Sequence, residues 1–172
     1  MISNPMTSES TFMPAMPMKP IEGAASWQGL DFRNTGDFVH RLTDTEVAEI
    51  DAAVRTIIQG GINHIAIDSE NFELPQLGKR LLLIRDGVLL RGRGFMVIRG
   101  VPVERYSIQE AAAAFIGIGG YIGKPVSQNG KGHILGHVKD LGRSIEDPTA
   151  RIYQTTHRQT FHTDSADIRC YV

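Results

Sequence analysis

Apolar residues recur at helical spacing in three stretches of the chain. The first stretch follows Thr43, and Glu46 stands three residues after that threonine. This is the spacing of a capping box, in which each side chain bonds the backbone of the other residue. The apolar positions that continue the pattern are Val47, Ile50, Val54, Ile57 and Ile58. We predict a helix that begins after Thr43 and ends at Gly60-Gly61.

Two further helices are predicted in the same way. One runs from about Pro75 to Arg91, because proline suits the first turn of a helix. Its apolar face comprises Leu77, Leu81, Ile84 and Val88. The other begins at Ser107, where Glu110 repeats the capping-box spacing, and ends at Gly119-Gly120.

The remaining stretches favour extended structure. Residues 95–98 form a short apolar run between Gly94 and Gly100, which predicts a buried strand. After the third helix, Asn129-Gly130 predicts a tight turn. Extended structure is also predicted for four later stretches: 124–128, 134–138, 152–156 and 160–165. Because the helices come first and the strands follow, the pattern predicts an α+β domain rather than alternating βαβ units.

Composition narrows the classes of function. Five of the six methionines and four prolines lie within the first twenty residues, which predicts a disordered tail at 1–20 and one domain at 21–172. The net charge of −1 gives no electrostatic footprint for nucleic acid, and no apolar run reaches membrane-spanning length. One cysteine, Cys170, excludes an intrachain disulfide. Without a recognisable targeting signal, we expect a cytoplasmic protein.

The candidate chemistry lies in residues 160–165, Thr-Phe-His-Thr-Asp-Ser. In a strand, alternate side chains share a face, so His162 and Asp164 would point the same way with Cα atoms roughly 6.6 Å apart. An imidazole and a carboxylate are two of the three ligands of the facial triad that binds non-haem iron. Taken alone, the pair also fits a strand-end histidine hydrogen-bonded to a nearby carboxylate.

The surrounding sequence strengthens the metal interpretation. Residues 92–102, GRGFMVIRGVP, resemble the early strand of the TauD/TfdA family of dioxygenases. Later pieces follow in the order of that family: GKPVSQ at 123–128, GHVKD at 136–140, YQT at 153–155 and FHTD at 161–164. The resemblance covers about residues 21–172.

The resemblance implies a fold, a reaction and cofactors. The fold would be the N-terminal part of a double-stranded β-helix, a jelly-roll of the clavaminate synthase-like type, incomplete and with helices packed outside. His162 and Asp164 would bind Fe(II), with 2-oxoglutarate as co-substrate. The family uses O2 to hydroxylate a small organic substrate while 2-oxoglutarate is decarboxylated to succinate.

The sequence departs from the family pattern at its end. The family has a second metal-binding histidine and a 2-oxoglutarate-binding arginine well downstream, but the sequence stops at Val172. We therefore expect a fragment that is inactive alone. The alternative is a non-catalytic remnant of the fold that serves as a binding or assembly module. A structural zinc site is less favoured, because it wants four protein ligands and no cysteine pair exists.

Other residues fit the metal site less well. His157 would face the opposite side of a continuous strand from His162. His133 and His137 would lie about 13 Å apart in a strand, too far to bind one ion together. Asp167 could compete with Asp164, but strand alternation and the family pattern both favour Asp164.

Overall fold

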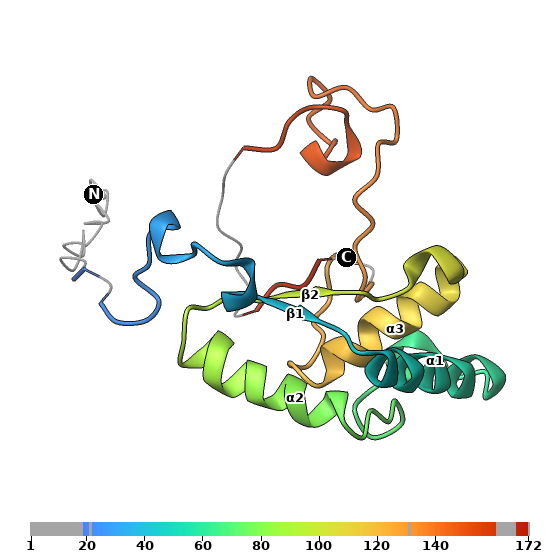
Figure 1. Cartoon of the computed structure of the whole chain (residues 1–172). Helices are drawn as coiled ribbons and strands as arrows, with labels where there is room; N and C mark the ends of the chain where they lie inside the picture. Colours follow the sequence, from blue (N-terminus) through green and yellow to red (C-terminus); the bar gives the residue numbers. More distant parts are fainter. Residues whose placement is uncertain (1–18, 21, 131, 161–167, 172) are drawn as a thin grey trace, which may run out of the picture.

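The computed structural model describes residues 19–20, 22–130, 132–160 and 168–171. Three α-helices form its body: α1 (Asp44–Gln59), α2 (Leu77–Leu83) and α3 (Ile108–Gly120). A π-helical segment, Ile84–Leu90, continues α2, and two short strands, β1 (Val39–Arg41) and β2 (Val97–Arg99), pair beside the helices (Figure 1). Five short 3-10 segments complete the described elements: Gly29–Asp31, Thr35–Asp37, His64–Ala66, Val103–Arg105 and Ile152–Gln154.

Both predicted capping boxes are confirmed. At the start of α1, the Thr43 side chain accepts from the Glu46 amide, and the Glu46 carboxylate accepts from the Thr43 amide. Ser107 and Glu110 make the same pair of bonds at the start of α3. Each box satisfies backbone N–H groups that have no partner within the helix, so both helices begin where the sequence predicts.

The second helix begins later than predicted and changes character. Its first residue is Leu77 rather than Pro75, and its first free amides donate to the carboxylate of Glu49 on α1. Beyond Leu83 the helix widens into the π segment, which the apolar spacing does not predict. After the π segment the chain folds back, and the backbone of Gly92 lies close to the backbone of Gly87. A Cβ on Gly92 would lie 2.6 Å from the Gly87 carbonyl oxygen. Only glycine fits this close approach of backbone to backbone.

The two strands run parallel, with Val39 opposite Val97 and Arg41 opposite Arg99. The predicted strand at 95–98 is thus present as β2, but it is not buried, since Val97 is 42% exposed. Its partner β1 was not predicted, and the connection between them passes through α1 and α2. The mixed α and β character is confirmed. The prediction against a βαβ arrangement was wrong for this strand pair, because parallel strands need such a crossover.

The core lies between the helices and the 67–74 segment that joins α1 to α2. Its fully buried side chains include Ile50, Ile57, Phe72, Leu77 and Leu81. Tyr121, just after α3, stabilises the 67–74 segment with two hydrogen bonds. Its hydroxyl donates to the Phe72 carbonyl and accepts from the Leu74 amide. The same tyrosine ring packs against α2 at Gly78, where an added Cβ would lie 2.5 Å from the ring.

The predictions of strand at 134–138 and 152–156 were wrong. Residues 134–138 have no regular structure, and Ile152–Gln154 is a 3-10 turn. Residues 141–154 form a closed loop, which we call the Arg143 loop, whose ends meet where the Leu141 amide donates to the Gln154 carbonyl. Figure 1 shows this part of the chain standing clear of the helical body. Within the described ranges the strands are β1 and β2, so the jelly-roll stays a prediction.

Arg143 holds this loop from within. Its guanidinium donates to the Asp147 carboxylate at 2.5 Å, to the Thr149 hydroxyl and carbonyl, and to the Gln154 side chain at 3.4 Å. The pKa of Asp147 is lowered to about 2 by hydrogen bonds to its carboxylate. The Thr149 hydroxyl contributes most, followed by the Thr149 amide and the Arg143 guanidinium. These bonds favour the charged carboxylate, so the loop should keep its structure well below neutral pH.

We expect Arg143→Ala to open this loop while the helical body stays folded. The Leu141 and Ala150 amides, which bond inside the loop, should then exchange with solvent at least about tenfold faster, as locally unfolded segments do. Hydrogen exchange followed by mass spectrometry measures this effect. Lys139→Ala, an exposed change just outside the loop, is the matched control and should leave exchange unaltered. Equal exchange in both variants would show that Arg143 does not hold the loop.

Candidate functional site

The predicted metal ligands, His162 and Asp164, lie outside the described residues, as does Asp167. The chain on both sides of them is described, and it defines how this stretch is anchored. On the approach, Thr155 is buried, its hydroxyl donates to the Ile152 carbonyl at 2.8 Å, and the same oxygen accepts from the His157 amide at 3.2 Å. A buried threonine whose hydroxyl makes two hydrogen bonds therefore anchors the chain seven residues before His162.

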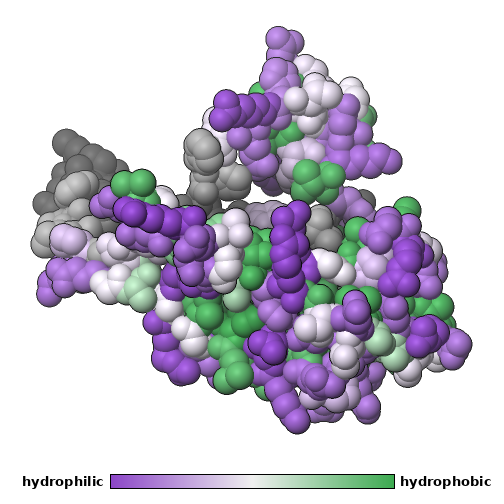
Figure 2. Space-filling view, viewed as in Figure 1, coloured by the Kyte–Doolittle hydropathy of each residue, from purple (hydrophilic) through white to green (hydrophobic). Residues whose placement is uncertain are grey.

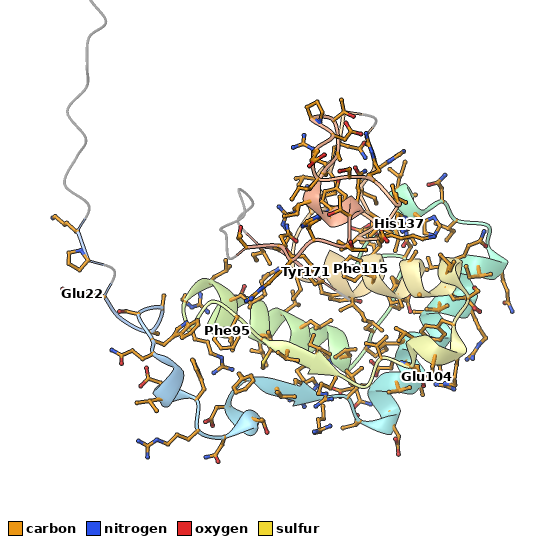
Figure 3. The ribbon with its side chains drawn as sticks, turned by 90° about the horizontal axis from the view of Figure 1, so that it is seen from above. Glu22, Phe95, Glu104, Phe115, His137 and Tyr171 are labelled. Atoms are coloured by element: carbon orange, nitrogen blue, oxygen red, sulfur yellow. The ribbon has the colours of Figure 1, made fainter. Side chains whose placement is uncertain are left out.

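On the far side, the chain returns to the body of the molecule. The half-buried Ile168 packs against the hydrophobic core, and the Arg169 guanidinium donates to the side-chain oxygen of Gln128 at 3.0 Å. Figure 3 shows Tyr171 in the same region of the molecule as Phe115 of α3. The exit of the stretch is thus tied to the segment that follows α3.

The Gln128 segment is a turn, as Asn129-Gly130 predicts. The Gly132 amide donates to the Asn129 carbonyl at 3.0 Å, and the Gln128 amide donates to the His133 carbonyl at 2.6 Å. The Asn129 side chain also lies 3.0 Å from the His133 ring nitrogen Nδ1. The His133 side chain therefore stabilises the turn.

The other histidines do not converge on a common point. His137 and His157 are exposed. His40 lies 3.2 Å from the Glu46 carboxylate, and His64 lines a shallow pocket of about 240 Å³ between α1 and α3. In the described part of the chain, no group of three or more His, Cys, Asp or Glu side chains could hold a metal ion.

A buried acidic group, Glu46, lies at the junction of β1, α1 and α2. Glu46 is 3% exposed and accepts from Thr43, from Arg80 at 3.0 Å and from His40. Burial alone would raise its pKa, but the Thr43 amide, His40, the Thr43 hydroxyl and Arg80 together outweigh burial and lower it. Both carboxylate oxygens of Glu46 have a partner, so we interpret the cluster as a structural ionic network rather than a catalytic site.

Sequence reasoning missed Gln128 and Arg169 as neighbours of the candidate site. The two residues are 41 positions apart, and no local pattern links them. The described residues also contain no helix that is both long and apolar enough to span a membrane.

Comparison with known proteins identifies relatives of the chain. No family model matches it. The taurine hydroxylase-like protein SAT17 of Stachybotrys chartarum is 31% identical over 150 residues, which cover 83% of this chain and 39% of that protein. The chain is a relative of taurine hydroxylase-like proteins. FR-33289 synthase of Streptomyces rubellomurinus is 28% identical over 151 residues, which cover 87% of this chain and 44% of that protein.

These relatives confirm the predicted family resemblance, and their names denote a hydroxylase-like protein and a synthase. The matched region takes in most of this chain. The chain spans less than half the length of each of these two relatives.

Proposed function

We propose that this chain contributes two iron ligands, His162 and Asp164, to an Fe(II)- and 2-oxoglutarate-dependent dioxygenase that hydroxylates a small organic substrate. The observation that carries this proposal is the similarity over 150 residues to a protein named as taurine hydroxylase-like. The His-x-Asp pair at 162–164 supplies the imidazole and carboxylate that non-haem iron sites require. The jelly-roll that the family resemblance implies belongs to the same proposal.

The donor set fits the ion. Imidazole nitrogen and carboxylate oxygen are ordinary ligands of Fe(II), and two such groups leave room for a third ligand, for 2-oxoglutarate and for O2. When bound, the iron and 2-oxoglutarate would supply the oxidising chemistry, because protein side chains do not provide it. The residues of this chain would bind the ion, while buried Thr155 and core-packed Ile168 anchor the chain on either side of the ligands.

Iron binding tests the proposal. Under anaerobic conditions we expect the chain to bind Fe(II), and we expect His162→Ala and Asp164→Ala each to weaken binding at least about tenfold, because each removes a ligand. Isothermal titration calorimetry measures the affinity. His137→Ala and His157→Ala are matched controls, since each removes an exposed imidazole, and they should change affinity less than about twofold.

Two outcomes would count against the iron site. One is binding that all four substitutions weaken equally, and the other is a folded chain that binds no iron. The second outcome would favour the alternative function, a non-catalytic binding or assembly module. An apolar surface supports that alternative, because Leu83, Leu90 and Val97 are all exposed, and Figure 2 shows apolar side chains gathered over α2. Self-association measured by sedimentation velocity would support this alternative.

A further inference from the structure

Four aromatic side chains form a cluster beside the β1–β2 pair. Trp27, Phe32 and Phe38 lie on the chain that leads into β1. Phe95 lies two residues before β2. The Phe32 ring is at the centre of the cluster, with its centroid 5.2 Å from that of Trp27, 5.7 Å from that of Phe38 and 5.1 Å from that of Phe95. All three contacts are edge-to-face, an arrangement in which aromatic rings attract one another, so the cluster joins two segments that are distant in sequence.

Polar contacts reinforce this junction. The Trp27 indole N–H donates to the Arg93 carbonyl at 2.9 Å, across 66 positions of sequence. The Arg93 guanidinium carbon lies 5.7 Å from the centroid of the Phe95 ring, which is within the range of a cation–π contact. The Trp27 ring lies 5.0 Å from the same Phe95 ring. Residues 93–95 therefore hold Trp27 through both a hydrogen bond and a ring contact.

Residues 27–41 are separate from the hydrophobic core, and we call them the N-terminal strap. Within the described ranges, no residue of the strap belongs to the core or packs against it. Its other attachments are the pairing of β1 with β2, where the Val97 amide donates to the Phe38 carbonyl at 2.8 Å, and His40, which lies 3.2 Å from Glu46. Figure 1 shows the blue chain before β1 lying outside the three helices. A small apolar cluster of this kind, separate from the core, can open without global unfolding.

The strap ends at Leu42, where the chain joins the helical body. Leu42 packs against the core, and its amide donates to the Arg99 carbonyl at 2.9 Å. The next residue, Thr43, caps α1. We propose that the strap closes over the edge of β2 and opens as one unit about Leu42, with the aromatic cluster as its latch. Opening would break the β1–β2 pairing and free the Val97 amide, which leaves a strand edge that can accept another strand.

Trp27 reports on the latch, because it is the only tryptophan in the chain. As urea is raised, we expect Trp27 fluorescence to change at a lower midpoint than far-ultraviolet circular dichroism, which follows the helices. The midpoints should differ because opening the strap costs less free energy than unfolding the whole chain. Coincident midpoints in the unaltered chain would overturn the proposal.

Two substitutions remove the latch from opposite sides. Phe32→Ala deletes the central ring on the strap, and Phe95→Ala deletes the ring beside β2. In each variant we expect the Val97 amide to exchange with solvent at least about tenfold faster, because ring contacts that hold the strap closed are lost. Amides within α1, such as that of Val54, should exchange as they do in the unaltered chain. Hydrogen exchange followed by NMR resolves the two positions.

Leu30→Ala is the matched control. Leu30 lies within the same strap, but its side chain is 74% exposed and is not part of the aromatic cluster, so Val97 exchange should stay unchanged. Equal acceleration at Val97 in Leu30→Ala would overturn the latch, as would equal acceleration at Val97 and Val54 in Phe32→Ala. The urea comparison uses the unaltered chain, so it tests the strap even where a variant fails to fold.

Discussion

Replacing Gly117 with alanine should destabilise the chain by about 2–3 kcal/mol, the cost of overpacking a close-packed core. Gly117 lies in α3 and faces the ring of Phe72, which is fully buried. A Cβ at position 117 would lie 2.3 Å from Phe72 Cγ and 2.4 Å from Cδ1. The ring cannot move away easily, because Tyr121 holds the backbone of Phe72 and Leu74 in place. Urea denaturation followed by circular dichroism measures the loss.

Gly119 in the same helix provides the control. A Cβ there would meet nothing within 4 Å. Gly119→Ala should therefore be neutral or stabilising by up to about 0.5 kcal/mol, because alanine favours the helix. Phe72→Leu in the Gly117→Ala background should cost less than the sum of the two single changes, since the smaller side chain relieves the clash. Equal stability of the two glycine variants would show that the ring is not confined.

Local signals explain which elements the sequence predicts well. A capping box needs two residues three positions apart, so Thr43 and Glu46 alone indicate where α1 begins. The Ser107 and Glu110 pair does the same for α3. The family resemblance rests on short phrases that are equally local, and the relatives confirm it. Local sequence signals were therefore sufficient to predict where α1 and α3 begin and to predict the family resemblance.

Contacts between distant residues explain the wrong predictions. The β-branched and aromatic run at 152–156 favours a strand by composition, but Arg143 and the Leu141–Gln154 bond hold this region in a loop. β1 has three residues and no apolar alternation, and it exists because β2 pairs with it from 58 positions away. The link between Gln128 and Arg169 is of the same kind. Such features depend on which side chains meet after folding, which a periodic pattern does not encode.

Glu46→Ala should lower the free energy of unfolding by about 2–4 kcal/mol, because it removes a helix cap and breaks charged hydrogen bonds in a buried site. Glu46 links three elements, since it accepts from Arg80 of α2 and from Thr43, and lies 3.2 Å from His40 of β1. The Arg80 side chain is half exposed and can turn to solvent, which limits the loss. Glu110→Ala removes the capping-box partner of α3 in a more exposed setting and should cost less.

The pH dependence separates the charge of Glu46 from its size. The folded-state pKa of Glu46 lies below its usual value of 4.5, so its charge stabilises the fold fully above that value. As the pH falls through the folded pKa, the carboxylate is protonated and this contribution is lost. Glu46→Gln keeps the shape without the charge. Its deficit relative to the unaltered chain should therefore be constant from pH 7 to about pH 5 and shrink below about pH 4. Urea midpoints across this range measure it, and a deficit that did not shrink in acid would mean that the charge of Glu46 does not stabilise the junction of β1, α1 and α2.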